Sequence, residues 1–303
     1  MTIHARRAFT LFQLLVILAL LLLLFALLLP AVFKVRAAAA RAQSTNNLKQ
    51  LALACHNYAS ANNTFPPGND AHNFSAAAYL LPYIEQDGVF KTIDFTKPSD
   101  DKANDTARRV VIKTFLNPND PVMAPSPDSG PTNYLYNAGS KADLKDDDGI
   151  FYQDSKIKFT DITDGTSSTI LAGETLKGDG KTEAKDVHRQ HVKLDKAALR
   201  NVNDETGEAE WKNNKNIAGD RCAAWIDGRF LQGTFTGTRL PNSPGPDVSC
   251  GGAGGLSALR SLDQNITFAM CDGSVRTSSA TALKADTWKY LTARNDGMPV
   301  PNF

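Results

Sequence analysis

The sequence predicts an α+β fold in which one long N-terminal helix, the stem, packs on a mainly antiparallel β-sheet that forms a globular head. Three features predict this fold. Residues 9–33 are almost entirely apolar, helical periodicity continues to about residue 62, and strand patterns dominate the rest of the chain. The 303 residues allow one large domain or two small ones.

The overall composition excludes several functional classes. The formal net charge is +1, so bulk electrostatics give no reason to expect nucleic-acid binding. The four cysteines form no Cys-x-x-Cys pair, which argues against zinc fingers, thioredoxin-like motifs and ferredoxins. The chain carries no complete catalytic or phosphate-binding motif, so we expect neither an enzyme nor a cofactor.

The apolar N-terminal segment favours a membrane span. Residues 9–33 are interrupted only by Thr10, Gln13 and Pro30, and about 25 helical residues extend roughly 37 Å, enough to cross a bilayer. A cleaved secretory signal is one alternative, but its apolar region is shorter, about 7–15 residues. A plain signal anchor is another. The expected partner of this segment is the lipid bilayer.

Residues 34–64 are expected to continue the helix as an amphipathic half. Apolar side chains recur at spacings of three and four with one longer gap, while Lys49 and Gln50 face outward. The apolar positions are Val35, Ala39, Ala42, Leu48, Leu51, Ala54 (or Cys55) and Tyr58. We predict that this face packs on the strands of the head, and that Pro66-Pro67-Gly68 ends the helix.

Local patterns predict the elements of the head. They are a helix at 76–85, a turn at Asp87-Gly88, strands at 150–152, through Ile157 and Phe159 and at 169–172, and a C-terminal helix capped by Asp286. The strongest local pattern is the alternation of Ile266, Phe268 and Met270 before Asp272-Gly273. It predicts a hairpin with a two-residue turn, in an antiparallel sheet that faces the stem.

Residues 177–220 differ from their surroundings because they are dense in Lys, Asp, Glu and Asn. We expect a charged surface insertion in which Val187, His191, Leu194 and Ala198 line one face of a helix. His188 and His191 would share a side, but the Glu of the His-Glu-x-x-His motif is missing. Two solvated histidines are therefore the favoured interpretation over a metal site.

One acidic run is a weak candidate for metal binding. Asp146 and Asp148 could offer carboxylate oxygens to calcium, although the ligands of an EF-hand alternate over a longer loop. A solvated turn before the strand at 150–152 is the alternative. We expect no other metal ligands.

The N-terminal residues carry a resemblance to a known family. Ala8–Leu15, with the sequence AFTLFQLL, resembles the type IV prepilin signature GFTLxELL, and Arg6-Arg7 precede it. The resemblance implies that a prepilin peptidase cuts between Ala8 and Phe9 and methylates Phe9. It also implies a leader in the cytoplasm and a head on the periplasmic side of the inner membrane, with a single pass between them.

Gln13 and Pro30 bear on assembly through the same resemblance. Pro30 falls where pilin helices commonly carry proline. Gln13 stands where pilins carry a glutamate that meets the amino group of the neighbouring subunit. Since glutamine carries no charge, we expect a homopolymeric filament to be disfavoured.

The later part of the chain resembles a large bacterial family of prepilin-like proteins of unknown function. The segments that carry the resemblance are Asn46–Leu53, His56–Tyr58, Phe65–Gly68, Leu80–Gln86, Asn133–Tyr134, Asn137–Gly139, Asp164–Leu171 and Gly173-Glu174. The C-terminal domain of that family is named for an H-x(9)-D-G pattern. Asp272-Gly273 supply its second half, whereas Leu262 occupies the position of the histidine.

The resemblance implies that the cysteines of the head lie outside the cytoplasm, where disulfides persist. Cys222 paired with Cys250 is the connectivity that we consider, although spacing alone does not settle it. Cys55, on the stem helix, is expected to be a small buried residue.

These observations combine into one organisation. It consists of a leader at 1–8, a transmembrane part of the stem at 9–33, an amphipathic part at 34–64, and a head at 65–303 with the insertion at about 177–220. The expected function is that of a pilin-like or pseudopilin-like structural or interaction protein, with other pilin-like subunits or envelope proteins as partners. The alternative is a membrane-tethered enzyme or binding module, which a deep pocket with converging perturbed carboxylates or histidines would favour.

Overall fold

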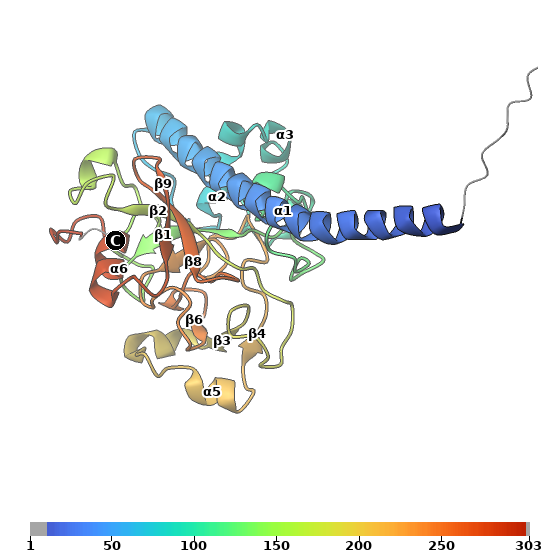
Figure 1. The fold of residues 1–303 in the computed structure, drawn as a ribbon. Helices are drawn as coiled ribbons and strands as arrows, with labels where there is room; N and C mark the ends of the chain where they lie inside the picture. The colour runs from blue at the N-terminus through green and yellow to red at the C-terminus, as the bar shows by residue number, and fades with distance from the viewer. Residues whose placement is uncertain (1–10, 301–303) are drawn as a thin grey trace, which may run out of the picture.

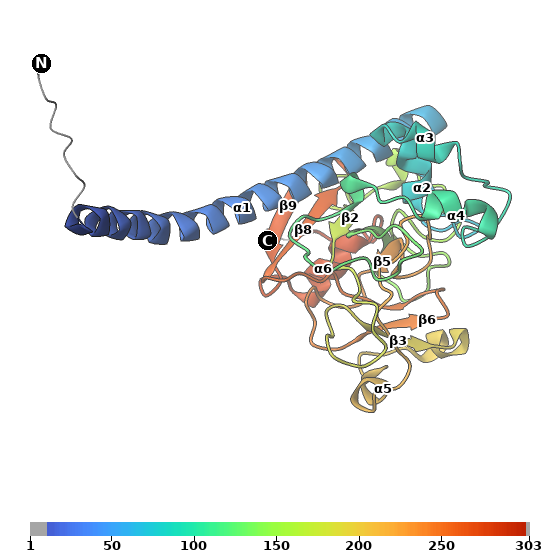
Figure 2. The ribbon, with the colours of Figure 1, turned by 90° about the vertical axis from the view of Figure 1, so that its right-hand side faces the viewer.

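One helix dominates the N-terminal part of the computed structural model, which describes residues 11–300 (Figure 1). Helix α1 runs unbroken from Leu11 to Asn62, and Pro30 lies within it. It ends where Asn63 takes a left-handed φ of 61°, shortly before Pro66-Pro67. Its first part projects beyond the head, and its second part lies along the head (Figure 2). The predicted single stem helix is therefore confirmed.

The predicted membrane span at 9–33 is not confirmed. Within residues 11–300, none of the helices combines the length and the apolar character required to cross a membrane.

The main sheet of the head has five strands in the order β5-β1-β2-β8-β9. They are β1 (Tyr134–Gly139), β2 (Ile170–Glu174), β5 (Thr234–Thr236), β8 (Asn265–Met270) and β9 (Val275–Ser279). All neighbours are antiparallel except β1 and β5, which are parallel. The predicted mainly antiparallel sheet and the strand at 169–172 are therefore confirmed.

The stem packs on this sheet, but through small side chains. Leu48 and Leu51 of α1 are buried in one cluster with Ala172 and Ala269, while Tyr58 is half-buried against tyrosines of the neighbouring short helices. The alternating large residues of β8 point the other way. Ile266, Phe268 and Met270 pack with α6 (Ala285–Thr292), around Trp288 and Leu291. The sheet thus faces the stem as predicted, but with its small side chains: alanines on the stem side let the helix backbone approach the sheet.

A second sheet was not predicted. Its strands are β4 (Ile217–Ala218), β3 (His191–Leu194), β6 (Asp247–Cys250) and β7 (Gly255–Leu256), in the order β4-β3-β6-β7. β3 and β6 are parallel, and the two outer pairs are antiparallel. The predicted helix through His191 and Ala198 is wrong, since His191 and Val192 face opposite sides with the period of a strand.

Short helices complete the head. The α-helices are α2 (Ala76–Leu80), α3 (Asp87–Phe90), α4 (Asp105–Arg108) and α5 (Glu208–Lys212). The 3-10 helices are η1 (Leu81–Ile84), η2 (Lys102–Asn104), η3 (Lys113–Phe115), η4 (Phe159–Asp161) and η5 (Lys196–Asn201). The helix at 76–85 is thus confirmed as α2 followed by η1.

Four local predictions are wrong. Asp87-Gly88 begin α3 instead of forming a turn, and the cap of α6 is Lys284 instead of Asp286. The segments 150–152 and 157–159 form no strand: the Ile157 carbonyl accepts one bond from the Phe65 backbone N–H, and no ladder follows. Residues 150–151 form bends and Phe159 begins η4, since a side-chain alternation makes a strand only where a neighbouring strand pairs with it.

Candidate functional site

The first part of α1 exposes an apolar surface on every side. Leu20–Phe25 span more than one helical turn, and each of these side chains is 44–62% exposed. We call residues 11–35 of α1 the apolar arm. Its exposed large apolar residues are Leu11, Phe12, Leu14, Leu15, Val16, Ile17, Leu18, Leu20, Leu21, Leu22, Leu23, Leu24, Phe25, Leu28, Leu29, Val32, Phe33 and Val35. A helix that is apolar all round is typical of one that is buried in protein or in lipid.

The site residues predicted at the N-terminus can be located only in part. Ala8 and Phe9 lie outside the described residues. Gln13 lies on the apolar arm, and Pro30 lies further along the same part of α1. Asp272 and Gly273 lie between β8 and β9, beside the second half of α1.

Polar contacts fix the second half of α1 to the head. The Ser44 hydroxyl donates to Glu174 and lies 2.9 Å from the Tyr134 hydroxyl, both residues belonging to the main sheet. Asn47 Nδ2 donates to the Leu116 carbonyl at 2.9 Å. Burial raises the pKa of the Glu174 carboxyl, whose other oxygen accepts from Asn117 Nδ2 at 2.5 Å. The stem is therefore held in a defined register on the head as well as by apolar packing.

The turn at Asp272-Gly273 is clamped by a histidine from the stem. His56 Nε2 lies 2.8 Å from the carbonyl oxygen of Cys271, and the His56 ring packs edge-on against Phe159. Gly273 has a φ of 85° and donates its N–H to the Met270 carbonyl, so the hairpin has a three-residue loop instead of the predicted two-residue turn. Leu262 is exposed and takes no part in this contact. Sequence spacing could not reveal His56, because more than 200 residues separate it from the turn.

The two weak calcium candidates are not brought together as ligands. Asp148 accepts from the N–H and the hydroxyl of Ser140, at 2.6 and 2.8 Å, while Asp146 is exposed with a left-handed φ of 53°. Between residues 11 and 300 no cluster of three or more His, Cys, Asp or Glu side chains could hold a metal ion. The acidic run instead forms a tight loop, in which Asp147 is buried and accepts from the backbone N–H groups of Lys141 and Asp148.

Asp147 makes the stability of this loop depend on pH. Burial, and then the neighbouring Asp148 charge, raise the pKa of Asp147 to about 8 from an ordinary value of 3.8. The folded state thus holds a proton that the unfolded state has lost, and its stability falls as the pH rises between these values, by up to about 1.4 kcal/mol per pH unit. Asp147→Asn should remove that decline. Urea unfolding at pH 5 and pH 8.5, with exposed Asp146→Asn as the control, measures it; parallel pH profiles for Asp147→Asn and the unmodified chain would refute the assignment.

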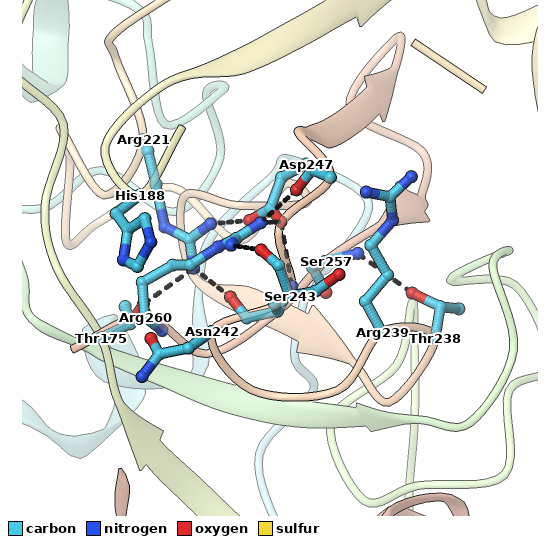
Figure 3. A network of polar contacts seen from close by, with 12 residues as sticks. Thr175, His188, Arg221, Thr238, Arg239, Asn242, Ser243, Asp247, Ser257 and Arg260 are labelled. Atoms are coloured by element: carbon cyan, nitrogen blue, oxygen red, sulfur yellow. Dashed lines mark hydrogen bonds and ion pairs between the residues drawn. The ribbon is translucent and has the colours of Figure 1, made fainter. Parts of the chain in front are cut away.

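A buried ion network joins the two sheets (Figure 3). Asp247, the first residue of β6, pairs through one oxygen with Arg221 and through the other with Arg260 Nη2 at 2.6 Å. All three side chains are fully buried. Arg221 Nη2 also donates to the Thr175 hydroxyl, directly after β2, at 2.7 Å. Burial lowers the pKa of each arginine to about 10, so two cations share one carboxylate inside the head.

A second buried ion network centres on Asp120. Asp120 forms ion pairs with Lys177 Nζ at 3.2 Å and with Arg189 Nη2 at 2.8 Å, and all three side chains are at most 6% exposed. The charged segment at 177–220 is therefore not solvated throughout, because Lys177 and Arg189 are buried. Its charged residues dock it onto the head, and only part of it faces water.

The favoured interpretation of two solvated histidines is wrong for His191, and the disulfide that we considered is not formed. His191 is buried, and its Nε2 is 3.6 Å from Asp220 Oδ1; burial lowers its pKa, so the ring is neutral. His188 lies instead beside Arg260 in the first network (Figure 3). All four cysteines are free and buried, which confirms Cys55 and contradicts a Cys222–Cys250 disulfide. These two cysteines lie in different apolar clusters, one beneath the main sheet and one on the second sheet.

The comparisons with known proteins give one family. The family described as protein of unknown function (DUF1559) matches residues 34–282, which begin just before the end of the apolar arm and include both sheets. No curated protein and no solved structure matches the chain. Residues 8–15, which resemble the prepilin signature, lie before the matched residues. Because the match covers most of the sequence, the chain belongs to the DUF1559 family of proteins of unknown function.

Proposed function

We propose that this protein is a pilin-like structural or interaction protein of the cell envelope, held at a lipid bilayer by its apolar arm. The single observation that carries the proposal is that the arm exposes apolar side chains on every face, whereas the apolar core of the head is buried. The head would be presented outside the cytoplasm, to like subunits or to an envelope partner.

Lipid is the occupant that best fits the arm. Burying one large apolar side chain contributes about 1.5–3 kcal/mol, so leaving this many in water is very unfavourable. A groove on another protein covers one face of a helix, whereas acyl chains cover every face. Exposed Lys34 lies near the end of the arm and exposed Arg36 directly after it, where basic side chains suit the headgroup region.

The prepilin resemblance supplies the finer part of the proposal. A prepilin peptidase would remove residues 1–8 and leave Phe9 as the new amino terminus. Gln13 would then offer its neighbour an amide in place of a carboxylate, so the protein would remain a single anchored subunit or join a filament built by others. The motif at 8–15 supports this step of the proposal.

Fractionation of cells that express the full chain tests the anchoring. We expect the protein to sediment with membranes, to resist extraction at alkaline pH, and to be released by detergent. Protease added outside intact spheroplasts should degrade the head. Recovery of the intact chain in the soluble fraction after alkaline extraction would contradict the proposal, and mass spectrometry of the amino terminus tests cleavage at Phe9 separately.

A further inference from the structure

The loop at 261–264 of the head lies beside the stem, close to the end of the apolar arm. Arg41 of α1 pairs with Asp263 at 3.1 Å, and the loop lines a cavity of about 340 Å³ together with Ala37 of the same helix. Lys34 is the first charged residue of α1. Ala37 and Arg41 follow it by about 4.5 and 10 Å along the helix, so the loop lies only a short way beyond the arm.

Hydrogen bonds hold this loop in a defined conformation. Asn242 Nδ2 donates to the Ser261 hydroxyl and to the Asp263 carbonyl, each at 3.0 Å. The Ser261 N–H donates back to Asn242 Oδ1 at 2.9 Å, and the Asn265 N–H donates to Asp263 Oδ1 at 2.8 Å. Both neighbours of Leu262 are thus fixed, while Leu262 itself is 62% exposed. The loop therefore presents an apolar side chain on the surface of the head near the arm.

The continuous helix sets the height of this loop above a bilayer that holds the arm. Residues 14–33 form about 30 Å of helix, which matches the hydrocarbon core and puts Lys34 at its surface. The headgroup layer beyond the core is about 5–8 Å thick, and the loop lies beside residues about 4.5–10 Å beyond Lys34. Since α1 is unbroken where it passes from the arm to the head (Figure 2), the head cannot rise away from the membrane.

We propose that the loop at 261–264 is a second membrane contact, in which Leu262 lies in the headgroup layer of the bilayer that holds the arm. This inference rests on the proposed function. Lipid headgroups suit the surface around Leu262, because exposed Lys34 and Arg41 can meet lipid phosphates and Arg41 offsets the charge of Asp263. A contact to one side of the helix axis would restrict the direction in which the arm tilts.

Site-specific fluorescence quenching in lipid vesicles tests the proposal. Three matched variants of the full chain, Leu24→Cys, Leu53→Cys and Leu262→Cys, each carry one fluorophore. The three leucines are 51%, 60% and 62% exposed, and the four native cysteines are buried, so the label reacts at the introduced thiol. The vesicles contain a lipid with a nitroxide quencher either on its headgroup or in its acyl chain. Leu53 is the control, because it lies on the same helix about 28 Å beyond Lys34.

The two quenchers distinguish the loop contact from the anchoring. We expect the headgroup nitroxide to quench the label at Leu262→Cys several-fold more than the label at Leu53→Cys, and the acyl-chain nitroxide to quench the label at Leu24→Cys. Equal headgroup quenching at the first two positions, with the arm label quenched, would overturn the loop contact and leave the anchoring intact. An arm label that the acyl-chain nitroxide does not quench would contradict the anchoring, and the loop contact with it.

Discussion

Asp247→Ala should destabilise the head by about 3–5 kcal/mol, because it removes the one carboxylate between two buried guanidinium groups. Arg221 and Arg260 would keep their carbonyl contacts, including Arg221 to Ala258 at 2.7 Å and Arg260 to Gly245 at 2.8 Å. Neither could reach water, since both side chains are fully buried. Urea unfolding followed by the fluorescence of buried Trp225 and Trp288 measures the loss.

Two controls separate the network from a general effect of losing an acid. Glu208→Ala breaks the exposed Glu208–Lys212 pair at 3.0 Å and should change the free energy of unfolding by at most about 0.5 kcal/mol. Replacing all three network residues by apolar ones, as Arg221→Met, Asp247→Leu and Arg260→Met, should recover most of the loss. A loss below about 1 kcal/mol for Asp247→Ala would mean that the two arginines are not held by this carboxylate.

Elements with a strong local pattern could be predicted from the sequence. The stem helix and the β8–β9 hairpin each depend on periodicity within one segment, and both are present. The side of the sheet on which the large side chains of the hairpin lie could not be predicted in the same way. Large side chains at Ile266 and Phe268 identify a buried face, but a sheet covered on both sides has two such faces. The face towards the stem is the one with small residues, which allow the closer approach.

The candidate sites could be predicted only where their residues are neighbours in sequence. His56 contacts the turn after β8 only because the fold brings the stem and the hairpin together, and no sequence motif links these two segments. The density of charged residues at 177–220 indicated a surface segment. Composition does not show which charged residues are paired, so the burial of some of them could not be predicted. Arg189 finds Asp120 and Arg221 finds Asp247, and these partners turn charged residues into buried ones.

The second large effect is expected at the apolar arm. Leu21→Arg combined with Leu24→Arg places two charges on its exposed surface without touching the packed half of α1. Each arginine in the middle of an inserted helix costs about 2.5–3.5 kcal/mol, so two should reduce retention in the membrane by more than about a hundredfold. The measured quantity is the fraction of the full chain that stays with membranes after alkaline extraction.

The matched control places two arginines at exposed apolar positions of the head. Val111 and Met123 are also exposed apolar residues, 57% and 85% accessible, and lie far along the chain from the arm. Val111→Arg combined with Met123→Arg should leave membrane retention unchanged, because in the proposed function lipid covers the arm and not the head. The urea midpoint of the head should be the same in both double variants, since the core clusters on the two faces of the main sheet include neither arm residues nor Val111 and Met123. If the arm variant were retained as fully as the control, another protein surface rather than lipid would have to cover the arm.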